Sequence, residues 1–213
     1  MIELHYTNAR RKDSIPDRNE LLTSFNMFAS PGTDIWVEPP ETIRFTAPFL
    51  HAMIHMTGFY GMRTRIEGDW SVDKDQAGLL IAMHYKMGNR DRKWVKAGIE
   101  FVNGTMHLSV ATKDEWAERK LWPIPEEEIA AAEVAGTGVG VSIGIGRKCN
   151  GALWIYWTDV EGGRHQIYEV PWAFDGEEMI DCWVGTYCAR PDQNAAKDLR
   201  VRFSEWMADI ELH

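Results

Sequence analysis

Residues 93–113 read KWVKAGIEFVNGTMHLSVATK, which is two alternating runs of apolar and polar residues separated by Asn103-Gly104. Asn-Gly between such runs is the strongest short signal for a two-residue type I′ hairpin turn, because both turn residues need positive φ. The turn fixes the strand register, so Val102 should lie opposite Thr105 and pairing should continue outward. The stretch therefore predicts an antiparallel hairpin with two different faces.

One face of this hairpin should belong to the core and the other should be polar. The core face would pair Phe101 with Met106, Ile99 with Leu108, Ala97 with Val110, and Val95 with Thr112. The polar face would pair Glu100 with His107, Gly98 with Ser109, Lys96 with Ala111, and Trp94 with Lys113. Small residues with a polar rim suit a ligand groove. The solvated side of an ordinary antiparallel sheet alternates in the same way, so both interpretations stay open.

The preceding strand should extend both faces of the hairpin. Its alternating apolar residues, Ala77, Leu79, Ile81, Met83 and Tyr85, predict a core side if an odd-length loop spans residues 88–92. Leu80 would then lie beside Glu100, Ala82 beside Gly98, and His84 beside Lys96. The candidate catalytic residues are Glu100, His107, Lys96 and His84. The candidate substrate-binding residues are Gln76, Trp94, Ser109, Trp116, Trp154 and Tyr156, since Trp and Tyr rings can stack on flat ligands.

Composition limits the partners that this chain can have. A net charge of -9 and a pI near 5.3 argue against nucleic acid and anionic membranes, which need a basic field. No run approaches the ~20 apolar residues of a membrane span. Residues 1–17 lack the apolar core of a signal peptide, so we expect a cytoplasmic protein. Cys149, Cys182 and Cys188 have no metal-ligand spacing and are expected to be thiols.

Short strands separated by turn residues predict a single all-β domain over 1–213, a β-sandwich or jelly roll of two antiparallel sheets with little helix. Residues 1–20 should form a short strand and a loosely attached arm. Residues 49–67 alternate as one long strand bent at Gly58 or Gly61. Residues 114–138 should form a long loop that could act as a lid, with one short helix at EEEIAAAE.

The glycine-rich segment 136–146 (GTGVGVSIGIG) superficially matches a nucleotide-binding loop. It lacks the Lys-Ser/Thr pair of a phosphate loop, so its glycines are expected in a strand. Residues 152–160 and 164–170 should form a second hairpin. Trp154 and Tyr156 would share one of its faces, because alternate residues of a strand point the same way.

Three motifs carry a resemblance to a known family. DQAGLL at 75–80, WVKAGIEF at 94–101 and the upstream ASPGTDIW at 29–36 resemble the DUF1349 family, which includes regulation-of-enolase-like proteins. The resemblance covers the chain from about residue 25 and implies a concanavalin A-like (lectin/glucanase) jelly roll. Two positions depart from the family pattern: Asp114-Glu115-Trp116 replaces Ser-Asp-Trp, and Ala189-Arg190-Pro191 replaces a Ser-Pro. The family name implies no reaction.

The chemistry of the polar face suggests two classes of function. A carboxylate beside an imidazole, as in Glu100 and His107, suits proton transfer near neutral pH. Glycoside hydrolysis needs two carboxylates, and Glu100 stands alone on its strand. We therefore expect a cofactor-independent, metal-free enzyme of small-molecule metabolism, of cyclase, isomerase, lyase or pericyclase type, acting on a largely apolar substrate. The alternative is a non-catalytic lectin-like module for a sugar or metabolite. A homodimer is left open.

Overall fold

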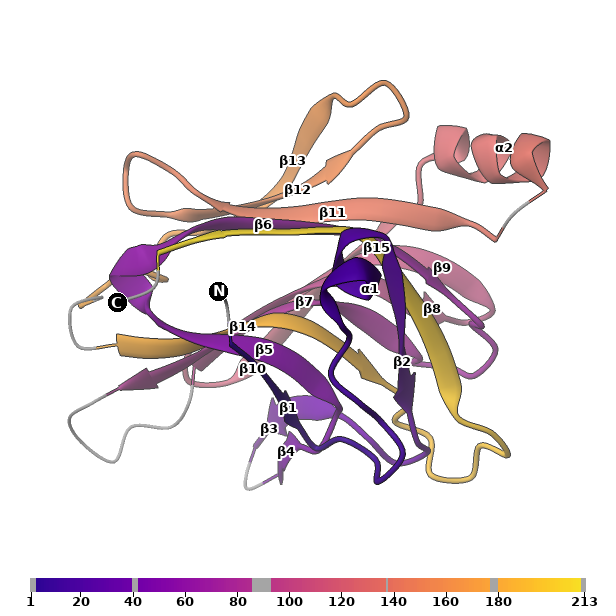
Figure 1. The fold of residues 1–213 in the computed structure, drawn as a ribbon, viewed down its shortest axis with the longest axis horizontal. Helices are drawn as coiled ribbons and strands as arrows, with labels where there is room; N and C mark the ends of the chain where they lie inside the picture. The colour runs from indigo at the N-terminus through magenta and orange to yellow at the C-terminus, as the bar shows by residue number, and fades with distance from the viewer. Residues whose placement is uncertain (1–2, 40–41, 86–92, 137, 177–179, 212–213) are drawn as a thin grey trace.

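The computed structural model consists mainly of two antiparallel sheets packed face to face (Figure 1). It describes residues 3–39, 42–85, 93–136, 138–176 and 180–211. In that part of the chain the first sheet has seven strands, in the order β1-β5-β14-β7-β8-β9-β10. These strands are β1 (Leu4–Thr7), β5 (Phe49–His55), β14 (Ile180–Ala189), β7 (Gln76–Tyr85), β8 (Lys93–Val102), β9 (Thr105–Lys113) and β10 (Ala117–Pro123).

The second sheet has six described strands, in the order β13-β12-β11-β6-β15-β2. They are β13 (Arg164–Val170), β12 (Leu153–Thr158), β11 (Gly140–Arg147), β6 (Phe59–Gly68), β15 (Leu199–Ile210) and β2 (Ser24–Ala29). The predicted β-sandwich class is therefore confirmed. The glycine-rich segment does form a strand, β11, and the predicted second hairpin is β12–β13.

The core lies between the two sheets and is built from alternate residues of each strand. Ile99 and Leu108 of the first sheet belong to the same buried cluster as Ile66, Ile143 and Phe203 of the second. Burying apolar side chains contributes about 25 cal/mol per Å² and is the main stabilising term of a sandwich. The core faces predicted from alternation are the observed ones.

The hairpin over 93–113 has the predicted register throughout, from Val102 opposite Thr105 to Trp94 opposite Lys113. Asn103 and Gly104 have φ of 51° and 79°, the left-handed conformation that a type I′ turn requires. Local turn chemistry thus fixed this pairing.

The predicted pairing of β7 with β8 is wrong by four residues. Leu80 lies opposite Lys96, not beside Glu100, and Gln76 is the residue opposite Glu100. His84 lies opposite Asp181 of β14 and not beside Lys96. An even shift keeps every side chain on its predicted face, because side chains alternate with a period of two. The predicted loop at 88–92 lies outside the described residues.

Residues 49–67 form two strands and not one bent strand. β5 ends at His55, the 3-10 turn η1 (Met56–Gly58) follows, and β6 continues in the other sheet. At Gly58 a Cβ atom would lie 2.7 Å from the carbonyl oxygen of Glu211. The chain therefore needs glycine where it crosses between the sheets at this point.

Residues 114–138 are also more regular than predicted. They contain β10, which pairs with β9, and the helix α2 (Glu126–Ala135), which ends at Gly136 with φ of 62°. The sequence AERKLWP of β10 is strongly charged, which is typical of a strand at a sheet edge. A charged edge strand does not alternate cleanly, and this explains why the segment was expected to be a loop.

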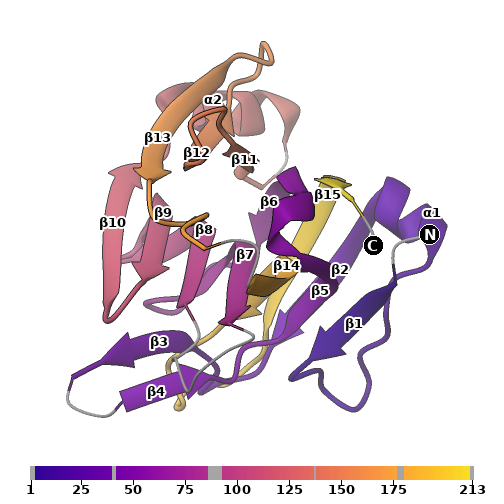
Figure 2. The same cartoon turned by 90° about the vertical axis from the view of Figure 1, so that its left-hand side faces the viewer.

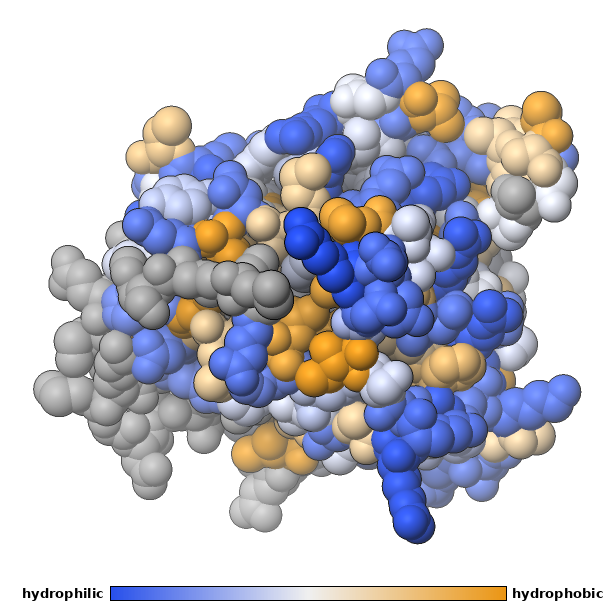
Figure 3. Space-filling model, in the orientation of Figure 1, coloured by the Kyte–Doolittle hydropathy of each residue, from blue (hydrophilic) through white to orange (hydrophobic). Residues whose placement is uncertain are grey.

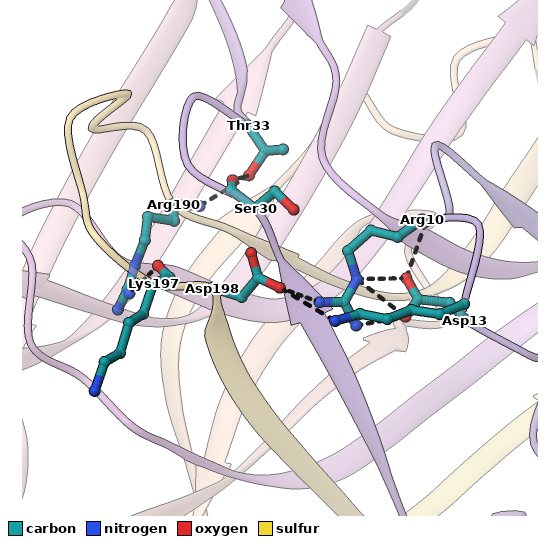
Figure 4. A network of polar contacts seen from close by, with 8 residues as sticks. Arg10, Asp13, Ser30, Thr33, Arg190, Lys197 and Asp198 are labelled. Carbon is teal, nitrogen blue, oxygen red and sulfur yellow. Dashed lines mark hydrogen bonds and ion pairs between the residues drawn. The ribbon is translucent and has the colours of Figure 1, made fainter.

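The N-terminal segment is held against the sandwich. β1 pairs with β5, and the short helix α1 (Arg18–Leu22) begins with a capping box formed by Asp17 and Glu20. The guanidinium of Arg10 forms ion pairs with Asp13 and Asp198 (Figure 4). The strand expected within residues 1–20 is present, and these contacts attach the expected arm to both sheets.

The smallest sheet is a hairpin of β3 (Ile35–Glu38) and β4 (Thr42–Phe45). It lies against the side of the seven-stranded sheet that faces away from the six-stranded sheet (Figure 2). We call this side the front face. It is the predicted polar face, and the hairpin determines how much of it stays open.

The surface seen in Figure 3 is largely hydrophilic, with a small group of apolar side chains near its middle. Among the described helices, none is long and apolar enough to cross a membrane. The three cysteines are free thiols, as predicted, and burial raises the pKa of Cys182 and Cys188 above the usual range.

Candidate functional site

The floor of the front face is formed by two glycines on adjacent strands. Gly78 of β7 lies opposite Gly98 of β8. A Cβ atom would lie 2.1 Å from the carbonyl oxygen of Ala97 at the first position and 1.9 Å from that of Ala77 at the second. Backbone atoms cannot move aside as side chains can, so these two positions require glycine. The result is a bare patch of backbone between taller side chains.

The β3–β4 hairpin covers much of the front face with apolar contacts. Ile35 and Phe45 pack in a second hydrophobic cluster, separate from the main core. Its buried members from the seven-stranded sheet are Phe49, Leu80, Ala82, Trp94, Ala111, Tyr187 and Ala189. Trp94 is only 2% exposed there, so it supports the hairpin and offers no open ring to a ligand.

Beside the hairpin, the front face retains a cavity of about 540 Å³, which we call the front cavity. Its lining comes from five strands and the adjoining turns, and most of it is charged or amide-bearing. The lining residues are Asp34, Trp36, Glu38, Arg44, Lys74, Gln76, Lys96, Glu100, Ala117, Arg119 and Pro191. This volume falls in the range of small-molecule sites, about 300–1,000 Å³.

Lys96 lies at the centre of the front cavity and is only 4% exposed. Its Nζ donates to Oε1 of Gln76 at 2.6 Å and to the carbonyl oxygen of Ile35 at 2.7 Å. The same Nζ lies 5.3 Å from the ring centre of Trp94 and 5.6 Å from that of Trp36. Cation–π contacts of this kind favour an ammonium in a site with little water.

Burial also changes the protonation of Lys96. Loss of hydration lowers its pKa from 10.5 to about 8, against the opposing pull of the carboxylates of Asp34 and Glu100. The ammonium therefore remains the major form at neutral pH, and a fraction is neutral amine just above it. A buried lysine with a lowered pKa in a cavity is a marker of a functional site.

Glu100 is 3% exposed and has partners for both carboxylate oxygens. Its Oε2 accepts a hydrogen bond of 3.0 Å from Oγ of Ser109, and its Oε1 forms an ion pair with Arg119. His107 lies opposite Glu100 in register, but its Nδ1 lies 3.0 Å from the carbonyl oxygen of Thr105. The predicted cross-strand position of His107 is confirmed, but Arg119 and Ser109, and not His107, are the hydrogen-bond partners of the Glu100 carboxylate.

The hairpin supplies the opposite wall of the front cavity. Asp34 lies just before β3, and its Oδ2 is 3.6 Å from Nη1 of Arg44 on β4. Trp36 is half-buried, and its Nε1 donates to Oε2 of Glu38 at 3.3 Å. Trp36 is therefore the aromatic side chain among those that line the cavity.

The rim is held by a buried ion pair that includes Asp75, the first residue of the DQAGLL motif. The guanidinium of Arg190 donates to both carboxylate oxygens of Asp75 at 2.7 and 2.6 Å, and to the carbonyl oxygen of Lys197 at 2.7 Å. Both side chains are almost fully buried. Asp75 and Arg190 thus connect Lys74 and Pro191, two lining residues, to the sandwich.

The structure brings together four of the predicted site residues, Gln76, Lys96, Glu100 and Ser109. Others lie elsewhere. His84 packs on Trp183 of β14 with ring centres 4.4 Å apart, away from Lys96. Trp116 is 48% exposed and does not line the front cavity.

Trp154 and Tyr156 do share a face, as predicted, and their rings stack 4.3 Å apart. That face belongs to the six-stranded sheet and not to the front cavity. The prediction that these two rings and the Glu100 group form one site is therefore wrong. A period of two shows which residues of one strand share a face, but not which sheet the strand joins.

Sequence reasoning missed Arg119, Trp36, Asp34 and Arg44. Arg119 lies in the segment expected to be a loop, and the other three belong to a hairpin more than fifty residues before Lys96. The one available signal was the motif ASPGTDIW, which contains both Asp34 and Trp36.

Comparison with known proteins shows what this chain is similar to. Residues 16–209 match the family described as protein of unknown function (DUF1349), and the chain belongs to that family. An uncharacterised protein of Emericella nidulans is 36% identical over 206 residues, which is 96% of each chain. The predicted family membership is confirmed.

Solved structures support the fold. A functionally unknown protein from Saccharomyces cerevisiae superposes with a TM-score of 0.71 at 18% identity, covering 99% of this chain and 97% of that one. A seed lectin of Lotus tetragonolobus superposes with a TM-score of 0.50 at 8% identity, covering 99% and 100%. The protein is a concanavalin A-like jelly roll, as the resemblance implied.

Proposed function

We propose that this protein binds a neutral, hydroxyl-rich ligand of carbohydrate type in the front cavity and does not transform it. This is the lectin-like alternative from the sequence. The observation that carries it is the lining, which combines carboxylates, cationic side chains and one amide with a single half-buried tryptophan. Hydroxyl groups both donate and accept, so they suit such a lining, and a sugar ring can stack on an indole.

The fixed positions of these polar groups support binding over proton transfer. Both carboxylate oxygens of Glu100 are already engaged, one by Arg119 and the other by Ser109, which fixes the orientation of this side chain. Lys96 is held in the same way by Gln76 and Ile35. Preorganised groups lower the entropy cost of binding a polar ligand. A largely apolar substrate would displace water from the charged and amide groups of this lining without offering them hydrogen bonds, which is unfavourable.

A second candidate function is the cofactor-independent enzyme. The observation that favours it is the pKa of Lys96, which burial lowers to about 8 and which suits a general base near neutral pH. In that case Lys96 would take a proton from a carbon or hydroxyl of the ligand, while Arg119 would hold a developing negative charge. The substrate would be polar, in contrast to the sequence-based expectation.

The two candidates can be separated in one experiment. Screening on a glycan array, followed by titration calorimetry with the hits, should identify a ligand whose binding falls by about tenfold or more in Trp36→Ala and Glu100→Gln. The matched control is Trp116→Ala, which removes an exposed tryptophan outside the front cavity and should bind normally.

NMR spectra of the ligand after prolonged incubation should show it unchanged. Conversion that is lost in Lys96→Met would instead establish the enzyme. Binding that persists undiminished in both cavity variants would show that the front cavity is not the site.

A further inference from the structure

The outer face of the six-stranded sheet carries a second hollow, of about 270 Å³, which we call the outer trough. It runs across β15, β6, β11 and β12. Its polar and aromatic lining consists of Tyr60, Arg63, Arg147, Trp154, Tyr156 and Arg164, with Asp209 at one side. None of these residues lines the front cavity, so the two sites are independent.

The floor of the outer trough is made of glycines that lie under the two stacked rings. A Cβ atom at Gly146 would lie 2.3 Å from Nε1 of Trp154, and one at Gly144 would lie 2.4 Å from the hydroxyl oxygen of Tyr156. The polar ends of both rings therefore reach across β11. Gly61 of β6 lies opposite Gly146 and extends the bare floor toward Asp209.

Three of the hydrogen-bond donors around this floor, on Trp154, Tyr156 and Arg63, have no acceptor among the described residues. In the part of the chain that the structure describes, no hydrogen bond uses Nε1 of Trp154 or the hydroxyl of Tyr156. Nε of Arg63 is enclosed and also has no partner among these residues. For Nε of Arg63, which is removed from water without an acceptor, this costs about 1–3 kcal/mol. These groups would gain free energy from a ligand that supplies acceptors.

The charge of the outer trough has the opposite sign to that of the whole chain. Arg63, Arg147 and Arg164 line it, against the single carboxylate of Asp209, on a protein whose net charge is -9. Arg164 lies 5.0 Å from the ring centre of Tyr156 and extends the stack of the two rings. Arginine is the residue best suited to bind an oxyanion with two parallel hydrogen bonds.

Strand irregularities occur next to these side chains. The pairing of β15 with β6 shifts between Ser204 and Met207, where Glu205 has φ of 52°, and Met207 lies opposite Arg63. The pairing of β12 with β13 shifts at Tyr156. Bulges redirect side chains, and they are frequent beside binding sites.

We propose that the outer trough binds the oxyanion, a carboxylate or a phosphate, of a small organic molecule about as large as a monosaccharide. The anion would accept hydrogen bonds from Trp154 and Tyr156 and pair with Arg63. The body of the ligand would lie beside the two rings, over the uncovered backbone of Gly61 and against Met207.

The test uses three probes of similar size, namely glucuronate, glucose 6-phosphate and glucose. The readout is the indole N–H resonance of Trp154 in ¹H–¹⁵N spectra, assigned by its loss in Trp154→Phe. At concentrations up to about 10 mM, at least one of the two anions should shift this resonance saturably, and neutral glucose should not. Which of the two anions shifts the Trp154 resonance shows whether the trough prefers a carboxylate or a phosphate.

Arg63→Gln should lower the affinity for the anion by about tenfold or more, since it removes a charge-assisted interaction. Arg63→Lys should lower this affinity less. If Arg63→Gln unfolds, Arg164→Gln at the exposed end of the stack replaces it. Trp36→Ala in the front cavity is the matched control and should leave the shift unchanged. Equal response to glucose, no response to either anion, or full binding in the arginine variants would overturn the proposal.

Discussion

The front cavity and the outer trough lie on sheet faces that each carry a pair of facing glycines, yet their polar groups are arranged in opposite ways. In the front cavity the central charges are paired with one another: Lys96 with Gln76, and Glu100 with Arg119 and Ser109. In the outer trough the arginines and the polar ends of Trp154 and Tyr156 face a single carboxylate, that of Asp209.

This difference indicates what each hollow can bind. A site with paired donors and acceptors is electrically balanced and rigid, so it selects by the geometry of hydrogen bonds. A site with surplus donors selects by charge, and it should respond strongly to salt because exposed charges are screened over about 10 Å at 0.1 M salt. Four predictions test this comparison.

The largest effect is expected at the rim of the front cavity. Arg190→Ala would leave the buried carboxylate of Asp75 without its partner, which should lower the free energy of unfolding by about 3–5 kcal/mol. Arg164→Ala in the outer trough, where the side chain is exposed, should cost less than about 0.5 kcal/mol. Urea unfolding measures both. If the two variants lost similar free energies of unfolding, the contrast between paired buried charges at the front cavity and exposed arginines in the outer trough would be refuted.

The protonation of Lys96 gives the second prediction. The pKa of Lys96 is about 8 in the folded protein and 10.5 without burial, so between these values the unfolded chain holds a proton that the folded chain does not. Stability should therefore rise with pH across this window, by up to about 3 kcal/mol in total. Subtracting the profile of Lys96→Met isolates this contribution. If the difference in free energy of unfolding between the wild type and Lys96→Met did not change from pH 7 to pH 10.5, burial would not be lowering the pKa of Lys96.

The glycine floors should respond differently to a methyl group. In Gly98→Ala the new Cβ meets backbone at 1.9 Å, so the strands must separate, and we expect a loss of about 3 kcal/mol or more. In Gly146→Ala the Cβ meets the Trp154 side chain, which can move, and the loss should be nearer 1 kcal/mol. Thermal unfolding compares the two. Gly146→Ala should nevertheless abolish anion binding in the outer trough while leaving the front cavity intact.

The smallest effect is expected for Trp116→Ala. This side chain is 48% exposed and lines neither hollow, so stability should change by less than about 0.5 kcal/mol and binding at both sites should persist. Calorimetry and spectra of this variant check the prediction. A marked loss of binding would mean that one of the sites extends beyond the lining described above.

The sequence predicts this fold well where the physics is local. The pairs from Val102–Thr105 to Trp94–Lys113 follow from one Asn-Gly turn, since a two-residue hairpin allows a single register. The register of β7 depends on a longer loop, which does not fix the pairing, and so only the face of each residue could be predicted.

In the candidate site, too, the residues placed by local strand alternation could be predicted, and those placed by long-range packing could not. Gln76, Lys96 and Glu100 lie on neighbouring strands, so alternation brings them together. Arg119 and Trp36 reach the cavity from an edge strand and from a separate hairpin. Their positions depend on how these elements pack in three dimensions, and the alternation of residues along a strand does not predict that packing. For the same reason the sequence does not reveal that Trp154 and Tyr156, two predicted substrate-binding residues, lie on the other sheet.

The β3–β4 hairpin also limits the shape of molecule that the front face can accept. Ile35 and Phe45 occupy the area above Leu80 and Trp94, where a chain-like ligand would otherwise lie along the sheet. The front cavity, lined by Arg119, remains open beside this hairpin. We therefore expect a polymer to enter only by its terminus, so that chain ends would be recognised and internal units would not.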